Sequence, residues 1–218
     1  MKYEELIACI KNFEARHWFG EYVYFKTLEE LKNVRKDLST LTKARMEEVV
    51  KIFLLQWGQM GRTVNRKDLN WEQLTNNLRN QKESFRRLQS ETLLDIDLDD
   101  KEVTDIIMEV IKSVRVRHIG PTAISKILHL FNPELFVMWD DRIRKKYLVG
   151  GNENCYLDFL KAVRQDVEEA IEGHARKSGI DKEEIIERIC RELPSKKLGQ
   201  KYSRKTLAKL IDEYNWIS

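Results

Sequence analysis

Apolar residues recur at helical spacing along most of the chain. One stripe has the spacing i, i+3, i+4, i+7, i+8 and i+11 and consists of Met46, Val49, Val50, Phe53, Leu54 and Trp57. The segments 103–114, 156–167 and 185–193 repeat the pattern. No segment alternates apolar and polar residues over the length of a strand. The pattern therefore predicts an all-α fold.

Start and stop signals divide this pattern into separate helices. Three pairs have the residue types and spacing of a capping box ahead of an apolar stripe: Asn70 with Gln73, Asp99 with Glu102, and Asp181 with Glu184. The helix breakers are Gly58, Gly61, Gly120-Pro121, Asn132-Pro133, Gly150-Gly151-Asn152 and Gly179. We expect about eight to ten helices with short connections and no flexible linker, so that residues 1–218 form a single all-helical unit.

The composition is typical of a globular helical protein. Hydrophobic residues make up 42% of the chain and charged residues 34%, with only three Pro, which excludes a disordered or collagen-like chain. A chain of this length can bury about 70% of its unfolded surface, so its core needs no staple. Cys9, Cys155 and Cys190 lie far apart and the histidines are isolated, so we expect no disulfide framework, no metal site and no cofactor.

The chain carries no sign of an export or membrane segment. It turns acidic at Glu4 and Glu5, where a signal peptide would turn apolar, and the apolar run from Ile52 to Leu55 is too short to cross a bilayer. Together with the unpaired cysteines, this predicts a cytoplasmic protein.

Charge is distributed unevenly over a chain whose net charge of +3 permits a nucleic-acid partner without requiring one. Acidic residues gather at 95–100 and 181–187. One later stretch contains basic residues without a carboxylate between them: Lys196, Lys197, Lys201, Arg204, Lys205 and Lys209. We expect this basic run to face a polyanion, and the alternative is a solvated helix face.

The stretch from residue 111 to residue 147 has the pattern of a helix, a tight turn, a second helix, a short loop and a third helix. The turn lies at residues 116–121, where Gly120 supplies a permissive backbone angle. Pro121 suits the first position of the next helix, because its missing N–H would be unpaired there. That helix ends at Asn132-Pro133.

The residues of this stretch resemble the helix-hairpin-helix and catalytic-aspartate segment of DNA glycosylases. The resemblance lies in Ile119-Gly120-Pro121-Thr122-Ala123, a short apolar helix, Pro133, and Phe136-Val137-Met138-Trp139-Asp140-Asp141-Arg142-Ile143. Asp140, with the aliphatic Ile143 one helical turn later, matches the position of the family's catalytic aspartate. The resemblance implies two lobes, residues 20–131 ending in the hairpin and residues 1–19 plus 132–218.

The sequence also departs from the family pattern. Gly120 stands alone where two glycines are usual, and the four-cysteine cluster of some members is absent. Pro121 stands where members with lyase activity carry their lysine nucleophile, which excludes a Schiff-base mechanism at that position. If the protein is an enzyme, the resemblance implies a monofunctional DNA N-glycosylase.

The resemblance assigns roles to individual residues. Asp140 would stabilise the positive charge that builds on the sugar as the N-glycosidic bond breaks. Amides of the hairpin would hold a backbone phosphate while the target base is flipped from the stack. The residues expected to contact nucleic acid are Arg117, His118, Gly120, Thr122, Ala123, Lys126 and Arg142. A flipped base could stack on Trp18, Tyr22, Trp57, Trp71 or Trp139.

Each of these assignments has a structural alternative. Asp140 or Asp141 could be a plain helix cap, and Gly120-Pro121 an ordinary turn between helices. Lys126 could be a solvated residue of a helix face, and large aromatic residues such as Trp57 are more often part of a core than of a stacking surface.

Three functions fit these observations. The first is a DNA-repair-like protein that binds duplex DNA and excises a damaged base by hydrolysis through Asp140. The second is a non-catalytic helix-hairpin-helix module that binds DNA or RNA, which the degenerate turn favours. The third is a helical interaction protein with no nucleic-acid partner, which the modest net charge favours.

Overall fold

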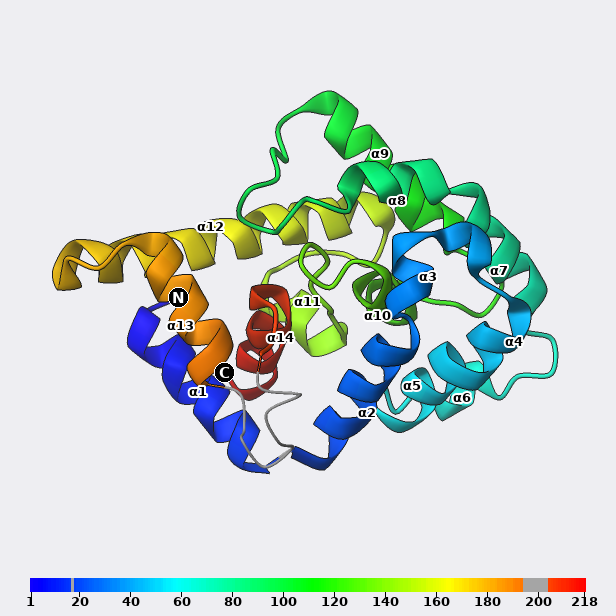
Figure 1. Cartoon of the computed structure of the whole chain (residues 1–218), viewed down its shortest axis with the longest axis horizontal. Helices are drawn as coiled ribbons and strands as arrows, with labels where there is room; N and C mark the ends of the chain where they lie inside the picture. The colour runs from blue at the N-terminus through cyan, green and yellow to red at the C-terminus, as the bar shows by residue number, and fades with distance from the viewer. Residues whose placement is uncertain (17, 194–203) are drawn as a thin grey trace.

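The computed structural model describes residues 1–16, 18–193 and 204–218, and these form helices and connecting loops without a strand (Figure 1). The all-α prediction is confirmed. The helices of the first half are α1 (Tyr3–Arg16), α2 (Trp18–Glu30), α3 (Lys32–Lys36), the 3₁₀ turn η1 (Leu38–Thr40), α4 (Lys43–Arg45), the π-helical η2 (Met46–Val50), α5 (Lys51–Gln56), α6 (Gly61–Val64), α7 (Trp71–Asn80) and α8 (Lys82–Leu88). Those of the second half are α9 (Lys101–Ser113), α10 (Pro121–Phe131), α11 (Asp141–Lys146), α12 (Glu153–Ser178), α13 (Lys182–Glu192) and α14 (Leu207–Ile217).

Side-chain caps start several of these helices. The side chains of Asn70 and Asp181 accept hydrogen bonds from backbone amides of α7 and α13, as predicted. The predicted cap at Asp99 is wrong by one residue: Asp100 accepts from the Glu102 amide (2.7 Å) and caps α9. Asp99 instead lies in the preceding turn, where its own amide donates to the Asp97 carboxylate (2.9 Å).

The structure has more helical segments than the periodicity predicts. Most of the extra segments are about one turn long, and a segment of that length is too short to show an apolar period. The stripe from Met46 to Trp57 is helical, but it begins as the π-helical η2 before α5 continues it. Met46, Phe53 and Leu54 from this stripe are fully buried. Among the described residues, none of the helices combines the length and apolar character that a bilayer crossing requires.

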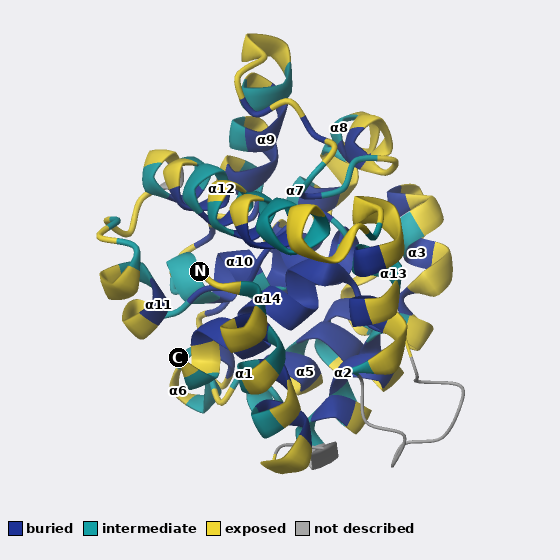
Figure 2. Ribbon diagram, turned by 90° about the vertical axis from the view of Figure 1, so that its left-hand side faces the viewer, coloured by how far each residue is buried: buried dark blue, intermediate teal, exposed yellow. Residues whose placement is uncertain are grey.

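Helices α10 and α14 lie at the middle of the molecule, where most of their residues are buried (Figure 2). Helix α1 packs on α14 and on α12, so the first and last helices of the described chain lie side by side (Figure 1). Helix α12 also packs on α9 and α13. The core thus joins segments from the whole length of the chain.

A buried polar chain fixes α10 to α2 and to the segment that leads into α11. The Tyr24 hydroxyl donates to His129 Nε2 (2.9 Å), and His129 Nδ1 donates to the Phe136 carbonyl (2.6 Å). Burial lowers the pKa of His129 to about 3, so the ring is neutral. A second pair of bonds links Ser125 Oγ to the backbone of Trp139, the residue before Asp140. The position of Asp140 is therefore set by the core.

Replacing Tyr24 with Phe should lower the free energy of unfolding by about 1–2 kcal/mol, because it leaves the buried His129 Nε2 without its donor. Urea unfolding followed by circular dichroism measures the effect. Tyr3→Phe is the control, since the Tyr3 ring stacks on His174 and its hydroxyl bonds to no described residue. Equal effects of the two substitutions would contradict the assigned role of the Tyr24–His129 bond.

Candidate functional site

The hairpin turn before α10 is built differently from the expectation. Gly120 has an ordinary extended backbone (φ −88°, ψ 175°), so the prediction that it supplies a permissive angle is wrong. His118 takes the left-handed conformation instead (φ 73°). His118 Nε2 lies 2.6 Å from Asp68 Oδ2, and this hydrogen bond lowers the pKa of Asp68 and holds the turn in place. Pro121 is the first residue of α10, as predicted.

The backbone of this turn predicts that Gly120→Ala leaves the free energy of unfolding within about 0.5 kcal/mol of the wild type. No atom lies within 4 Å of the added Cβ, and the backbone angles suit any residue. Gly58→Ala is the matched comparison, because its Cβ would lie 2.6 Å from the Leu54 carbonyl oxygen. That variant should lose about 1–3 kcal/mol. Thermal unfolding measures both, and a strongly destabilised Gly120→Ala would contradict the geometry.

The first turn of α10 presents free amides. The Ile124 amide donates to the Gly120 carbonyl (3.0 Å), whereas the amides of Gly120, Thr122 and Ala123 donate to no acceptor in the described part of the chain. Pro121 contributes no donor. Ala123 is fully buried, backbone included, so the amides within reach of a ligand are those of the exposed Gly120 and the partly buried Thr122. Two accessible amides at a helix N-terminus suit an anionic oxygen.

A cavity of about 1050 Å³ lies beside this turn. Of the residues predicted to form the site, Asp140, Thr122, Lys126 and Arg142 line it, whereas Arg117, His118, Gly120 and Ala123 do not. Its wall comes from segments far apart in sequence: Phe13 and Arg16, Gly20 and Glu21, residues 56–63, Thr122 and Lys126, residues 140–142, and Asp212 and Trp216. Arg16, Arg62 and Arg142 are exposed at the rim of the cavity, together with one exposed acid, Asp141, so cations outnumber acids there.

Asp140 is both a helix cap and a cavity residue. Its Oδ1 accepts the Ile143 amide (2.9 Å) at the start of α11, which is the predicted cap alternative. The side chain is only partly buried and lines the cavity. Oδ2 has no hydrogen-bond partner within the described ranges. One oxygen is thus used by the fold and the other is available to a ligand.

Lys126 reaches into the cavity, so the alternative of a solvated helix residue is wrong. Its ammonium donates to the Gly58 carbonyl (3.2 Å) and lies 5.2 Å from the centroid of the Trp57 ring. Burial lowers the pKa of Lys126, while the charges of Asp212 and Asp140 oppose that shift. The ammonium and the two carboxylates therefore interact within one cavity.

Trp57 is the described candidate for base stacking that lines the cavity. It is half-buried, Phe53 stacks on one of its faces (centroids 5.0 Å apart), and its Nε1 donates to Glu21 Oε1 (3.4 Å). The other candidates differ: Trp71 and Trp139 are buried in the core, Tyr22 is exposed away from the cavity, and the Trp18 side chain lies outside the described residues. At most one indole face of Trp57 is open to a ligand.

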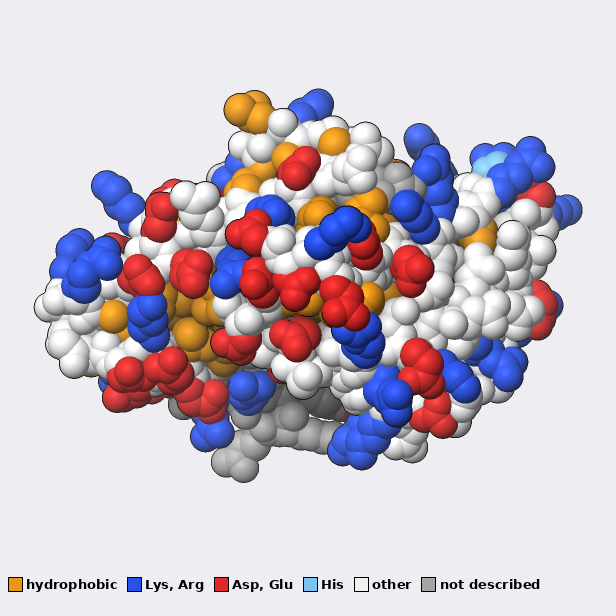
Figure 3. All heavy atoms as spheres, turned by 90° about the horizontal axis from the view of Figure 1, so that it is seen from above, with side chains coloured by type: hydrophobic (Ala, Val, Ile, Leu, Met, Phe, Trp, Pro, Cys, Tyr) orange, Lys and Arg blue, Asp and Glu red, His pale blue; other side chains and the backbone are white. Residues whose placement is uncertain are grey.

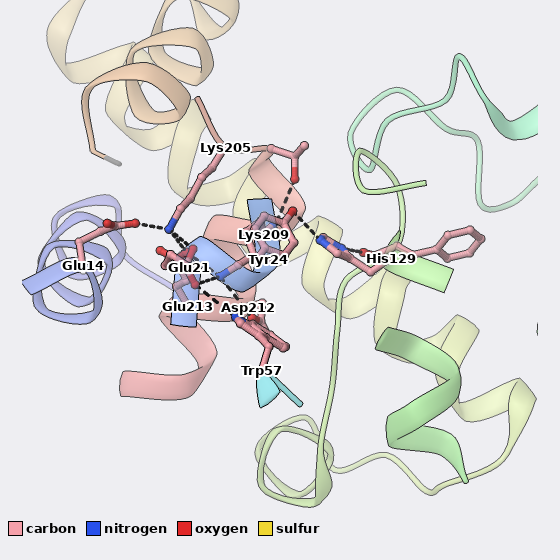
Figure 4. A network of polar contacts seen from close by, with 11 residues as sticks. Glu14, Glu21, Tyr24, Trp57, His129, Lys205, Lys209, Asp212 and Glu213 are labelled. Atoms are coloured by element: carbon pink, nitrogen blue, oxygen red, sulfur yellow. Dashed lines mark hydrogen bonds and ion pairs between the residues drawn. The ribbon is translucent and has the colours of Figure 1, made fainter. Parts of the chain in front are cut away.

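Buried charges lie next to the cavity (Figure 4). The Lys205 ammonium contacts Glu14, Glu21 Oε2 (2.5 Å) and Glu213 Oε1 (2.5 Å). The Lys209 ammonium contacts Glu213 Oε1 (2.6 Å) and Glu21 Oε1 (3.3 Å). The ligand atoms of Glu14, Glu21 and Glu213 all lie within 4.8 Å of one another, a spacing that would suit a metal ion, but the Lys205 ammonium binds to all three carboxylates.

The prediction that the basic run faces a polyanion is wrong for Lys205 and Lys209, which are 2% and 0% exposed. Arg204 is exposed but pairs with Glu187 (3.4 Å) and Glu134 (3.7 Å). Lys196, Lys197 and Lys201 lie outside the described residues. The sequence shows the positive charges but not their burial. The acids that neutralise these two lysines come partly from α14 itself, as Asp212 and Glu213, and partly from the distant helices α1 and α2, as Glu14 and Glu21.

Burial and the charges of the two lysines shift the pKa values of the acids of this cluster in opposite directions. Burial raises the pKa of Asp212 to about 6 and that of Glu213 to about 7. Burial also disfavours the ionised form of Glu21, but Lys209 and Lys205 outweigh it and lower the pKa of Glu21 to about 2. Glu21 therefore carries its charge at neutral pH, whereas burial favours the protonated form of Glu213 and the two lysines oppose it.

Replacing Lys205 with Met should lower the free energy of unfolding by about 3–5 kcal/mol, because three buried carboxylates lose the cation that they share. Lys182→Met is the matched control, since Lys182 pairs with Glu172 on the surface and its loss should have little effect. Urea titration measures both. A Lys205→Met protein as stable as the control would show that the cluster tolerates an uncompensated charge.

Comparison of the chain with protein-family models, with curated proteins and with solved structures finds no match.

Proposed function

We propose that this protein binds duplex DNA and excises a damaged base as a monofunctional DNA N-glycosylase, with Asp140 as the catalytic carboxylate. The observation that carries the proposal is the cavity that joins Asp140 to a stacking surface, Trp57, beside the free amides of α10. The local resemblance of residues 111–147 to helix-hairpin-helix DNA glycosylases supports the same function.

The packing of the helices supports the two lobes that the resemblance to DNA glycosylases implies. Helix α1 packs on α14 and α12, which joins residues 1–19 to the segment after residue 131. The cavity receives Trp57 and Lys126 from the first proposed lobe and Phe13, Asp140 and Asp212 from the second. Substrate pockets commonly lie where two lobes meet.

The proposed reaction uses these groups in a simple division of roles. The duplex is held at the hairpin through a backbone phosphate, and the target base turns out of the stack into the cavity and lies on Trp57. As the N-glycosidic bond breaks, the free oxygen of Asp140 stabilises the positive charge on the sugar and orients the attacking water. No lysine nucleophile is required.

The distribution of charge indicates which side of the protein meets DNA. Arg16, Arg62 and Arg142 are exposed at the cavity rim and suit phosphates. The face that carries α9 and α12 is different: acidic side chains gather across its middle among scattered basic ones (Figure 3). We therefore place the duplex over the cavity and the hairpin, away from that face.

A non-catalytic helix-hairpin-helix module is the second candidate. It is favoured by the contacts of Asp140, whose hydrogen bond in the described structure goes to the Ile143 amide alone, and by Pro121, which removes one donor from the hairpin. Such a module would bind duplexes without releasing a base.

Base release should separate the two candidates. We expect the wild type to bind a duplex with an abasic-site analogue more tightly than an intact duplex, with affinity that falls as salt rises. It should also release a base from at least one member of a panel of damaged duplexes. Asp140→Asn should lower that release by about 100-fold or more while it still binds the analogue.

Asp158→Asn, which makes the same change at an exposed position of α12, is the control and should keep full activity. Binding without release in either protein would establish the module. No binding even at low salt would rule out both candidates.

A further inference from the structure

Lys126 on α10 brings an ammonium group to the cavity, close to the proposed position of the base. Thr122 and Lys126 are four residues apart on one face of the helix, and both line the cavity. Lys126 therefore follows the amides at the start of α10 by about one helical turn. Its ammonium lies 5.2 Å from the centroid of the Trp57 ring, the surface on which the base is proposed to lie.

The Lys126 ammonium has donors left for a ligand. An ammonium carries three N–H donors, and in the described structure its hydrogen bond goes to the Gly58 carbonyl alone (3.2 Å). Burial lowers the pKa of Lys126, while the charges of Asp212 and Asp140 oppose that shift. An ammonium with a lowered pKa gives up a proton more readily than that of an exposed lysine.

The other charged groups of the cavity wall are less suited to give a proton to a base. The exposed arginines of the rim keep their protons, because a guanidinium is not deprotonated in proteins. Glu21 is ionised at neutral pH and has no proton to give. Burial raises the pKa of Asp212 to about 6, but Asp212 is 3% exposed and its Oδ2 has less than 1 Å² of accessible surface, so a base does not reach that oxygen. Among the described residues of the cavity wall, Lys126 is the acid best suited to a base.

Resting on the proposed glycosylase function, we propose that Lys126 is the general acid that protonates the departing base. The bond between C1′ of the sugar and the base nitrogen breaks, and its electron pair stays on the base. A proton moves from the Lys126 ammonium to a ring nitrogen of the base, which leaves as a neutral molecule. The oxygen of the attacking water bonds to C1′, and its proton goes to Asp140. Solvent then returns a proton to the Lys126 amine and takes one from Asp140.

This role differs from that of a lysine nucleophile. Lys126 forms no bond to the sugar, so the reaction remains monofunctional. Asp140 acts on the sugar and the water, and Lys126 acts on the base. The two groups therefore divide the charges that develop as the bond breaks, the positive charge on the sugar and the negative charge on the base.

The nature of the leaving base supplies the first test. A base alkylated on a ring nitrogen, such as 7-methylguanine, is positively charged in DNA and departs neutral without a proton. A deaminated or oxidised base, such as hypoxanthine or 8-oxoguanine, departs as an anion unless it is protonated. Single-turnover release would be measured at pH 7.5 from duplexes of one sequence that carry each lesion.

Lys126→Met should release the second kind of base about 100-fold more slowly than the wild type, and 7-methylguanine within about threefold of the wild-type rate. Lys112→Met, which removes an exposed lysine from α9, is the control and should keep the wild-type rates. Binding to the abasic-site analogue reports whether Lys126→Met is folded. If it does not bind, Lys126→Arg and the pH dependence of the wild type decide the question.

The pH dependence separates a proton donor from a positive charge. For bases that need a proton, the wild-type rate should fall as pH rises, because the amine form of Lys126 has no proton to give. Since burial lowers the pKa of Lys126, the fall should begin below the ordinary value of 10.5. Lys126→Arg keeps the charge but not a proton that can be transferred, so it should be about tenfold or more slower than the wild type and should not show this fall.

Other charged groups surround the Lys126 ammonium: Asp140, Glu21, Lys209 and Asp212. A fall with pH that persists in Lys126→Arg would belong to one of those groups and would count against the inference.

The outcomes separate this inference from the function on which it rests. A wild type that releases only alkylated bases would overturn the role of Lys126 and leave the glycosylase proposal standing. A folded Lys126→Met protein that keeps its activity, or loses it equally for both kinds of base, would do the same. If no damaged duplex of the panel loses a base, the proposed function fails and this inference fails with it.

Discussion

Two ammonium groups are buried among carboxylates where the first, second and last helices of the described chain meet. Lys205 and Lys209 contact Glu14 from α1, Glu21 from α2 and Glu213 from α14. Buried ion pairs add little net stability compared with a well-packed apolar core, but they tolerate few alternative arrangements, because each unpaired charge is costly. The cluster therefore specifies how these helices meet, and Glu21 extends it to the wall of the cavity.

The position of Asp140 follows from a second set of buried bonds. Tyr24 and His129 connect α2 to the Phe136 carbonyl, and Ser125 holds the backbone of Trp139. These bonds place the residue before Asp140 against α10, the same helix that begins at the hairpin. The hairpin amides and the carboxylate are thus parts of one rigid arrangement, in which a local change of the loop would disturb buried groups.

Local signals in the sequence were sufficient for local features. The helical period predicted the all-α class, Asn70 and Asp181 predicted helix starts, and Pro121 predicted the start of α10. The π-helical start of the stripe at Met46 and the left-handed backbone of His118 were missed, since neither residue type requires that conformation.

The cavity depends on contacts that no local pattern encodes. The residues around Asp140 in the sequence were enough to propose it as a site residue. Glu21, Trp57 and Asp212, however, come together only in the fold. The charges in and just before α14 were the most misleading, because Lys205 and Lys209 look like a solvated basic run until their acidic partners on α1, α2 and α14 are seen. A helix whose charged residues lie between apolar ones, as Lys209 and Glu213 do, is the one signal of burial that the sequence offered.

Helix α10 is buried along nearly its whole length, but its first turn is open at Gly120. A helix of this kind opens to hydrogen exchange only when most of the protein unfolds, whereas surface loops open far more readily. The amides at its first turn are consequently held in their final directions before any ligand arrives. An anion bound there would lose its own freedom of motion, but it would not have to order the protein, and its affinity would gain from that preorganisation.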